Sequence, residues 1–133
     1  MIGIDGGATK VSGAQVKKID DQTFDLLNPI KEMQYKEHKS YDSNFEPLTI
    51  QEQLDGWELS DAEHKQSQVY IECIIDIIEQ LIDKETPLIG IAMPGIKTED
   101  RRGIKAMANG PRIPNLCDEL EKRLLLKDKI KSI

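Results

Sequence analysis

The chain has 133 residues, of which 38% are hydrophobic and 32% charged, and this is the size and composition of one globular domain. Its net charge of −6 argues against a surface built mainly to bind nucleic acid, because such surfaces are usually basic. The apolar runs are too short to cross a bilayer, and the N-terminus lacks the pattern of a signal peptide, so no membrane partner is expected. Cys73 and Cys117 belong to no C-x-x-C pair, which disfavours a zinc site made within this chain. Two free thiols are typical of a reducing cytoplasm, and we expect a cytoplasmic protein.

The first strands are expected at the start of the chain. Residues 2–5 form a short apolar run and residues 10–18 suit its hairpin partner, with Gly6-Gly7 between them where a tight turn is needed. A third strand is expected over residues 23–35, although Pro29 weakens or bends it. The chain therefore opens with two or three antiparallel strands.

Residues 36–59 are polar, mixed in charge and without a clear period. They predict a long loop or inserted segment with one helical turn, and loops of this length are uncommon unless they are functional or mobile. A helix is expected to begin after Ser60, because Ser60 and Glu63 have the spacing of a capping box. It should end near Glu85, before Pro87. Its apolar stripe recurs at three- and four-residue spacing and consists of Tyr70, Ile71, Ile74, Ile75, Ile78, Leu81 and Ile82.

Residues 87–95 are short, mostly apolar and follow a helix, which is typical of a buried parallel strand. This strand ends at Pro94-Gly95, where a sharp loop is expected, and the charged residues 98–103 suit the tip of a hairpin.

A second helix is expected over residues 116–127, with Leu116, Leu120 and Leu124 on one face. Residues 129–133 resemble the approach to another strand. The order of these elements predicts an α/β fold in which antiparallel strands and helix-linked parallel strands share one mixed sheet, with flanking helices on its faces.

The turn sequence Asp-Gly-Gly-Ala-Thr-Lys, residues 5–10, has two possible purposes. The common phosphate motifs G-x-x-x-x-G-K-[ST] and G-x-G-x-x-G are both absent from it. Taken alone, it is typical of a plain glycine-rich hairpin turn. It also suits a phosphate cradle, because glycines let an anion approach the backbone and turn N–H groups can point at it. Asp5 would repel a phosphate unless a Mg²⁺ ion lay between them.

Two segments resemble a known superfamily. "IGIDGGATK" at residues 2–10 resembles the first phosphate motif of the superfamily of sugar kinases, heat-shock ATPases and actin. "IGIAMPGIKTEDRRGIKAMANGPRIPNL" at residues 89–116 resembles the second half of the N-terminal lobe of ROK-family sugar kinases and regulators. The two motifs occur in the family's order with a helix between them, and together the resemblance covers residues 1–35 and 60–133. It implies an RNase H-like fold and the transfer of a phosphoryl group from Mg·ATP to a sugar hydroxyl.

The resemblance also implies roles for particular residues. Asp5 would hold Mg²⁺, through water, and the residues that would face the β- and γ-phosphates of ATP are Gly6, Gly7, Thr9 and Lys10. Gly95 would line the sugar pocket, and Asn109 would hydrogen-bond a sugar hydroxyl.

Parts of the family pattern are missing from these 133 residues. The Asn-Asp pair that carries the general base, the cysteine-rich zinc motif and the second lobe are not found, and Asp118 and Asp128 stand in the wrong places to replace the base. We therefore expect residues 1–133 to be an incomplete N-terminal lobe that lacks its C-terminal partner lobe and has little or no kinase activity by itself. Because the sequence starts at the first strand, the resemblance favours the kinase branch over the DNA-binding regulators.

Other functions remain open. The chain also suits a non-catalytic module that binds a sugar, a nucleotide or a partner protein, the corresponding lobe of a ROK-type regulator, or a related acetyl-sugar kinase or ATPase of the same superfamily. An incomplete sheet leaves an exposed strand edge, which invites pairing with a second copy as a homodimer.

Several further residues have an ordinary structural interpretation. His38 and His64 lack partners at ligand spacing, and His64 is expected to face solvent. Residues 100–102, Asp-Arg-Arg, suit a solvated turn, and Cys73 suits a small core residue. The aromatic residues of the 36–59 segment are Tyr41, Phe45 and Trp57. They either stack on a sugar ring or nucleotide or, as loop aromatics more often do, pin the loop to the core.

Overall fold

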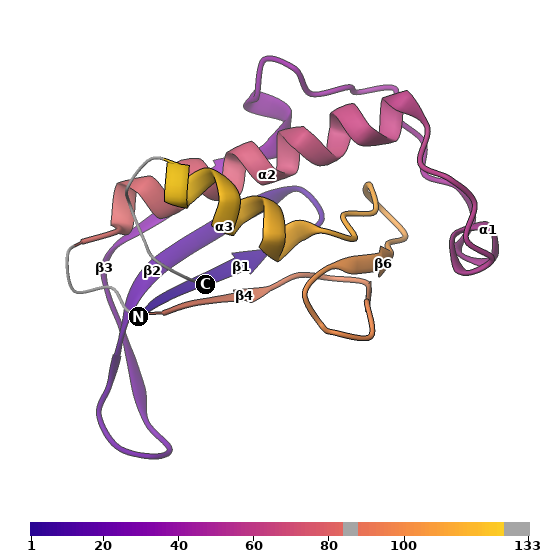
Figure 1. Ribbon diagram of the computed structural model, residues 1–133. Helices are drawn as coiled ribbons and strands as arrows, with labels where there is room; N and C mark the ends of the chain where they lie inside the picture. Colours follow the sequence, from indigo (N-terminus) through magenta and orange to yellow (C-terminus); the bar gives the residue numbers. More distant parts are fainter. Residues whose placement is uncertain (84–87, 127–133) are drawn as a thin grey trace.

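The computed structural model describes residues 1–83 and 88–126 (Figure 1). In chain order the elements are β1 (Ile2–Gly6), β2 (Lys10–Lys18), β3 (Phe24–Gln34), the 3₁₀ turn η1 (Tyr35–Glu37), α1 (Ile50–Leu54), α2 (Asp61–Leu81), β4 (Ile89–Ala92), β5 (Ile96–Lys97), β6 (Ile104–Ala106) and α3 (Leu116–Leu126). The strand expected at residues 129–133 lies outside the described residues.

Four strands form a mixed sheet in the order β3-β2-β1-β4. β1 pairs antiparallel with β2, which places Ile4 opposite Gly13, and parallel with β4, which places Ile4 opposite Ile91. β2 pairs antiparallel with β3, with an irregularity in the register between Gly13 and Gln15. The prediction of antiparallel strands followed by a helix-linked parallel strand is confirmed. β5 and β6 form a separate small hairpin whose tip is the charged turn expected at residues 98–103.

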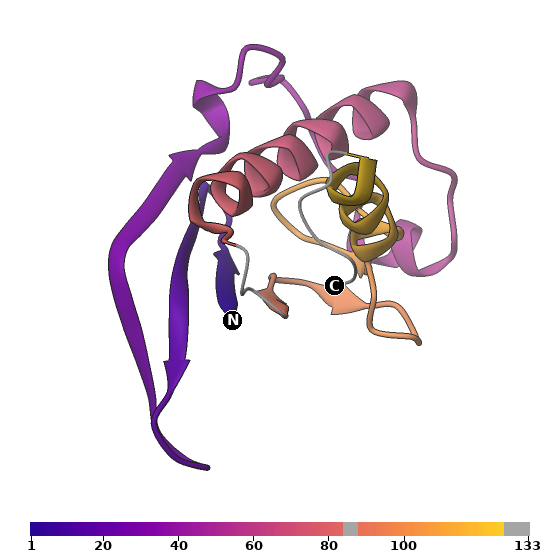
Figure 2. The same ribbon diagram turned by 60° about the vertical axis from the view of Figure 1, so that its left-hand side comes forward.

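The core lies between this sheet and α2. The apolar stripe of α2 is buried, as its spacing predicts, and shares one cluster with Ile2, Ile4 and Val11 of the sheet. α3 lies beside α2 on the same side of the sheet (Figure 2) and buries its three predicted leucines. On the opposite face Leu26 and Ile30 of β3 are 66% and 54% exposed. Helices were expected on the faces of the sheet, and among the described residues they cover one face only (Figure 2). Among these residues, no helix combines the length and apolar character needed to cross a membrane.

The predicted capping box at the start of α2 is only half present. The Ser60 hydroxyl accepts the Glu63 N–H at 3.1 Å, as expected. The Glu63 side chain does not return to the Ser60 backbone, because it turns into the interior and pairs with Arg112. The helix also ends at Leu81, before the predicted end near Glu85, and Glu85 itself lies outside the described residues.

Residues 36–59 contain more order than a long loop. β3 ends one residue before the predicted strand does, and Tyr35 begins η1 instead. α1 has the complete capping box, formed by Thr49 and Glu52, and Gly56 follows it with φ +82°, the left-handed conformation that often ends a helix. The buried Gln53 side chain joins α1 to the loop after β6, since it accepts the Met107 N–H at 2.8 Å and donates to the Met107 carbonyl at 3.0 Å. The segment is thus held against the rest of the chain.

Candidate phosphate and sugar site

The β1–β2 turn presents unpaired backbone donors. Gly7 N–H donates to the Lys10 carbonyl at 2.8 Å, and Tyr35 N–H donates to the Thr9 carbonyl at 3.0 Å. The first bond closes the turn on itself, and the second ties the turn to η1. The N–H groups of Ala8 and Thr9 donate to no acceptor in residues 1–83 and 88–126. Free N–H groups that follow one another in a turn can bind an anion.

The two glycines of the turn have different structural requirements. A Cβ atom on Gly6 would lie 1.9 Å from the Met93 sulfur, so a side chain there would displace the flexible end of Met93. A Cβ atom on Gly7 would have the Lys10 carbonyl oxygen as its nearest neighbour, at an ordinary 3.4 Å. The fold therefore does not require glycine at position 7, and the bare backbone there leaves room for a ligand.

Asp5 suits a water-mediated Mg²⁺ contact. Its side chain is exposed at the end of β1, beside Ser12 of β2 and Ala92 of β4, and it forms no ion pair with another described residue. Magnesium is usually held by one or two carboxylates, with waters and substrate phosphates completing its shell. Within the described ranges, no three His, Cys, Asp or Glu side chains converge to hold a metal by themselves. The residues fit an ion that arrives with a phosphate, and Asp5 is its candidate ligand.

Lys10 does not point at the free N–H groups of the turn. Its ammonium lies 2.7 Å from Glu32 Oε1 across the sheet, and this hydrogen bond holds the pKa of Glu32 below its usual range. The two side chains are 49% and 55% exposed. Exposed pairs of this kind contribute little to stability, so Lys10 can be redirected towards a phosphate at low cost.

The turn, the Pro94-Gly95 loop and the Asn109 loop meet at one small cavity of about 200 Å³. Ala8 contributes from the β1–β2 turn, Ile50 from α1, and Asn109 is the only polar side chain among the described lining residues. Gly95 has φ +97°, and a Cβ atom there would lie 2.3 Å from the Ala106 carbonyl oxygen. Glycine at position 95 is therefore required by the close approach of this loop to β6.

The structure thus brings some predicted site residues together and separates others. Gly95 and Asn109 share the cavity with the tip of the β1–β2 turn, whereas Asp5 lines a different hollow, on the open face of the sheet. Lys97 was missed by the sequence reasoning. Its ammonium donates to the carbonyl oxygens of Met93 at 2.5 Å and Gly95 at 3.1 Å, and these hydrogen bonds hold the Pro-Gly loop in place. A basic residue two positions after a Pro-Gly pair is the sequence signal that indicates it.

Tyr35, beneath the turn, carries an unpaired hydroxyl. The residue is 1% exposed and stacks on Tyr70 with ring centroids 3.8 Å apart, and burial raises the pKa of its phenol. The hydroxyl has no hydrogen-bond partner among the described residues. We predict that Tyr35→Phe raises the free energy of unfolding by about 1 kcal/mol, because an unpaired buried hydroxyl is removed and the stack is kept. Urea denaturation followed by circular dichroism measures this. A clear loss of stability would show that a water or ligand pairs with the hydroxyl.

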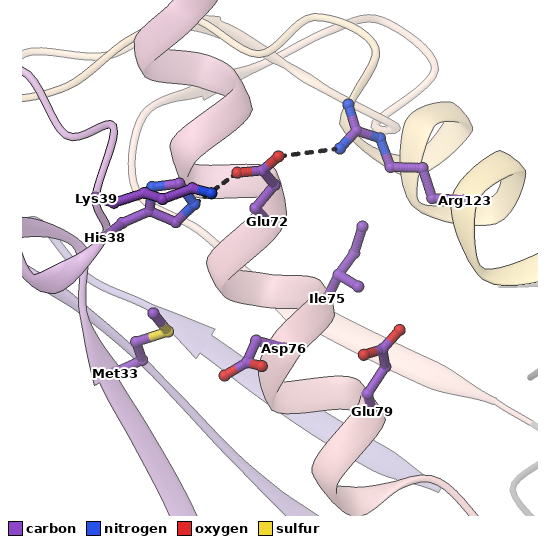
Figure 3. A pocket seen from close by; sticks show the side chains of 8 residues that line it. All are labelled: Met33, His38, Lys39, Glu72, Ile75, Asp76, Glu79 and Arg123. Atoms are coloured by element: carbon purple, nitrogen blue, oxygen red, sulfur yellow. Dashed lines mark ion pairs between the residues drawn. The ribbon is translucent and has the colours of Figure 1, made fainter. Parts of the chain in front are cut away.

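A second cavity, of about 550 Å³, lies between η1, α2 and α3 (Figure 3). Glu72 stands at its centre, with His38 Nε2 at 2.5 Å and Arg123 Nη1 at 3.9 Å. His38 Nδ1 accepts the Ser40 N–H at 3.1 Å. Both nitrogens of His38 are therefore engaged in holding the loop after η1 against α2. His38 has no partner at ligand spacing in the sequence, but in space it pairs with Glu72 of α2. His64 is exposed as predicted.

The remaining singled-out residues divide between core and surface. Cys73 is buried as predicted, and burial raises the pKa of its thiol to about 12. Asp100 and Arg101 are exposed, as expected of a solvated turn, whereas Arg102 is half-buried and reaches Asp118 at 3.0 Å and Glu121 at 2.7 Å on α3. Tyr41 and Phe45 are half-buried, which agrees with a pinning role. Trp57 is not pinned, since 55% of it is exposed.

Comparison with protein-family models, with curated proteins and with solved structures gives no match for this chain. Any functional assignment therefore rests on the residues and geometry described above.

Proposed function

We propose that this chain is the N-terminal lobe of an ATP-dependent sugar kinase with an RNase H-like fold, similar to the ROK family. The cavity of about 200 Å³ carries the proposal, because the tip of the β1–β2 turn, Gly95 and Asn109 come from three separated segments and share it. The strand order β3-β2-β1-β4, with β4 parallel to β1, supports the fold.

The described residues would act by positioning two substrates. Phosphoryl transfer depends mainly on alignment and on stabilising charge, which suits a site made of backbone donors. The free N–H groups of Ala8 and Thr9 would bind phosphate oxygens, and Asp5 would hold Mg²⁺ through water. The ion, when bound, neutralises charge on the phosphates. Asn109 would hold a sugar hydroxyl on the opposite side of the cavity.

The cavity carries no group that can accept the proton of the sugar hydroxyl. None of the described residues that line it is a carboxylate or histidine. We propose that the general base is not among the described residues, so these residues bind the ligands without transferring phosphate. The same observation favours the alternative function, a sugar- or nucleotide-binding module without catalysis. Sugar-dependent release of ADP by a protein that contains both lobes would distinguish the kinase from the module.

Replacement of Asn109 tests the sugar site. We predict that Asn109→Ala weakens hexose binding about fivefold, since one hydrogen bond contributes about 1 kcal/mol, and leaves the melting temperature unchanged because the side chain is exposed. Amide shifts of Gly95 and Ala108 in ¹⁵N-labelled protein, followed during titration with glucose, mannose and N-acetylmannosamine, measure the binding locally.

The matched control is Asn44→Ala, which removes another exposed asparagine that does not line the cavity. It should bind like the wild type. Absence of local shifts with all three sugars in the wild type would contradict the sugar site, as would equal binding by Asn109→Ala.

A further inference from the structure

Trp57 lines a hollow that the proposed kinase site does not use. It is the single tryptophan of the chain, and its exposed fraction is 55%. The hollow has a volume of about 440 Å³, within the range of small-molecule sites. Leu59 and Pro114 contribute apolar surface to it, and Glu58, His64 and Lys105 contribute polar groups.

The backbone beside this indole is fixed in place. Arg112 and Glu63 are 4% and 2% exposed, and they pair through contacts of 2.9 Å and 2.7 Å. The same guanidinium donates to the Trp57 carbonyl at 2.5 Å and to the Glu58 carbonyl at 3.4 Å. From the other side, Trp57 N–H donates to the Glu52 carbonyl at 3.2 Å. Burying an ion pair costs desolvation free energy. Here the buried pair fixes the backbone of Trp57, whose ring remains exposed to solvent. Such an arrangement is preorganised for a ligand.

Some of the polar side chains that line the hollow are free to bind a ligand. The side chains of Glu58, His64 and Lys105 make no hydrogen bond or ion pair with residues 1–83 or 88–126. Together they offer an acceptor carboxylate, a donor ammonium and an imidazole that does both. A ligand of mixed donor and acceptor character is needed to satisfy all three.

We infer that the Trp57 hollow binds a pyranose sugar, with the apolar face of its ring on the indole and its hydroxyls on Glu58, His64 and Lys105. Each sugar hydroxyl is both donor and acceptor, which matches this set of groups. A nucleotide suits the hollow less well, because its phosphates would meet the Glu58 carboxylate.

This hollow is separate from the cavity at Asn109. Gln53 of α1 lines the Trp57 hollow, whereas Ile50 of the same helix lines the other cavity. The hydrogen bonds of Gln53 to Met107 close the contact between α1 and the loop after β6. The inference therefore stands independently of the proposed kinase function.

Fluorescence tests the inference directly, because all tryptophan emission comes from Trp57. The wild-type chain is titrated with methyl α-D-glucopyranoside, methyl β-D-galactopyranoside and N-acetylglucosamine. We expect at least one to change the emission saturably at millimolar concentrations. Lys105→Ala should weaken that binding about tenfold, while Lys36→Ala, an exposed lysine outside the hollow, should leave it unchanged.

The kinase-site variant separates the two proposals. Asn109→Ala should keep the full Trp57 response even though its Gly95 shifts need a higher sugar concentration than those of the wild type. A linear response to all three sugars, equal to that of N-acetyltryptophanamide, would overturn the inference. Saturation by ATP or AMP but by none of the sugars would overturn it too, as would loss of the response in Asn109→Ala.

Discussion

Replacement of Arg112 with alanine is expected to lower the free energy of unfolding by about 3–5 kcal/mol. The change leaves the Glu63 carboxylate inside the protein, 2% exposed and without its cation. It also removes the donors to the Trp57 and Glu58 carbonyls, so the segment between α1 and α2 loses its anchor. Urea denaturation of the wild type and the variant measures the difference, and the loss is a large part of the 5–15 kcal/mol typical of a domain.

Arg102→Ala is the matched control, since its pairs with Asp118 and Glu121 lie at the surface and its removal should change stability much less. A double variant, Glu63→Met with Arg112→Met, asks a different question. Apolar replacement of both partners is often neutral or stabilising. Recovery of stability would therefore show that the pair positions the Trp57 segment and does not add to the free energy of unfolding. A loss below about 1 kcal/mol for Arg112→Ala would contradict the buried pair.

Replacement of Gly95 with alanine is expected to cost about 2–5 kcal/mol, from backbone strain together with overpacking. Gly95 has φ +97°, and the new methyl group would lie 2.3 Å from a backbone oxygen of β6 that cannot move aside easily. Thermal and urea denaturation measure this loss.

Gly7→Ala is the contrasting variant. Its methyl group meets only ordinary contacts, so its stability should stay within about 1 kcal/mol of the wild type. Equal stability of Gly95→Ala and the wild type would show that the Pro-Gly loop lies farther from β6 than described.

Local patterns predicted the elements well because their causes are local. The spacing of apolar residues in α2 and the glycine pair before β2 each depend on a few neighbouring positions, and the structure bears them out. The β1–β2 turn and the Pro-Gly loop were likewise visible as turns. The family resemblance implies separate roles for Gly95 and Asn109, but the meeting of these segments with the β1–β2 turn at one cavity is seen only in three dimensions.

The features that local patterns did not predict depend on contacts between residues distant in sequence. Glu63 has the spacing of a capping box, but its carboxylate pairs with the buried Arg112 instead of the Ser60 backbone. A charge-assisted hydrogen bond of this kind is stronger than the neutral one that a capping box offers. His38 looked unpartnered because Glu72 lies on another element. Of the two roles open to Trp57, pinning the loop is not the one seen, because the Arg112 guanidinium holds the loop through the Trp57 carbonyl and the ring is exposed.

Titration of ¹⁵N-labelled protein with Mg·ATP shows whether the β1–β2 turn binds phosphate. We expect saturable shifts of the Ala8 and Thr9 amides in the wild type. We also expect these shifts to be lost in Gly7→Ala, whose melting temperature stays the same because the fold tolerates a side chain there. Wild-type amides that do not respond, or a Gly7→Ala variant that responds as the wild type does, would contradict phosphate binding by the turn.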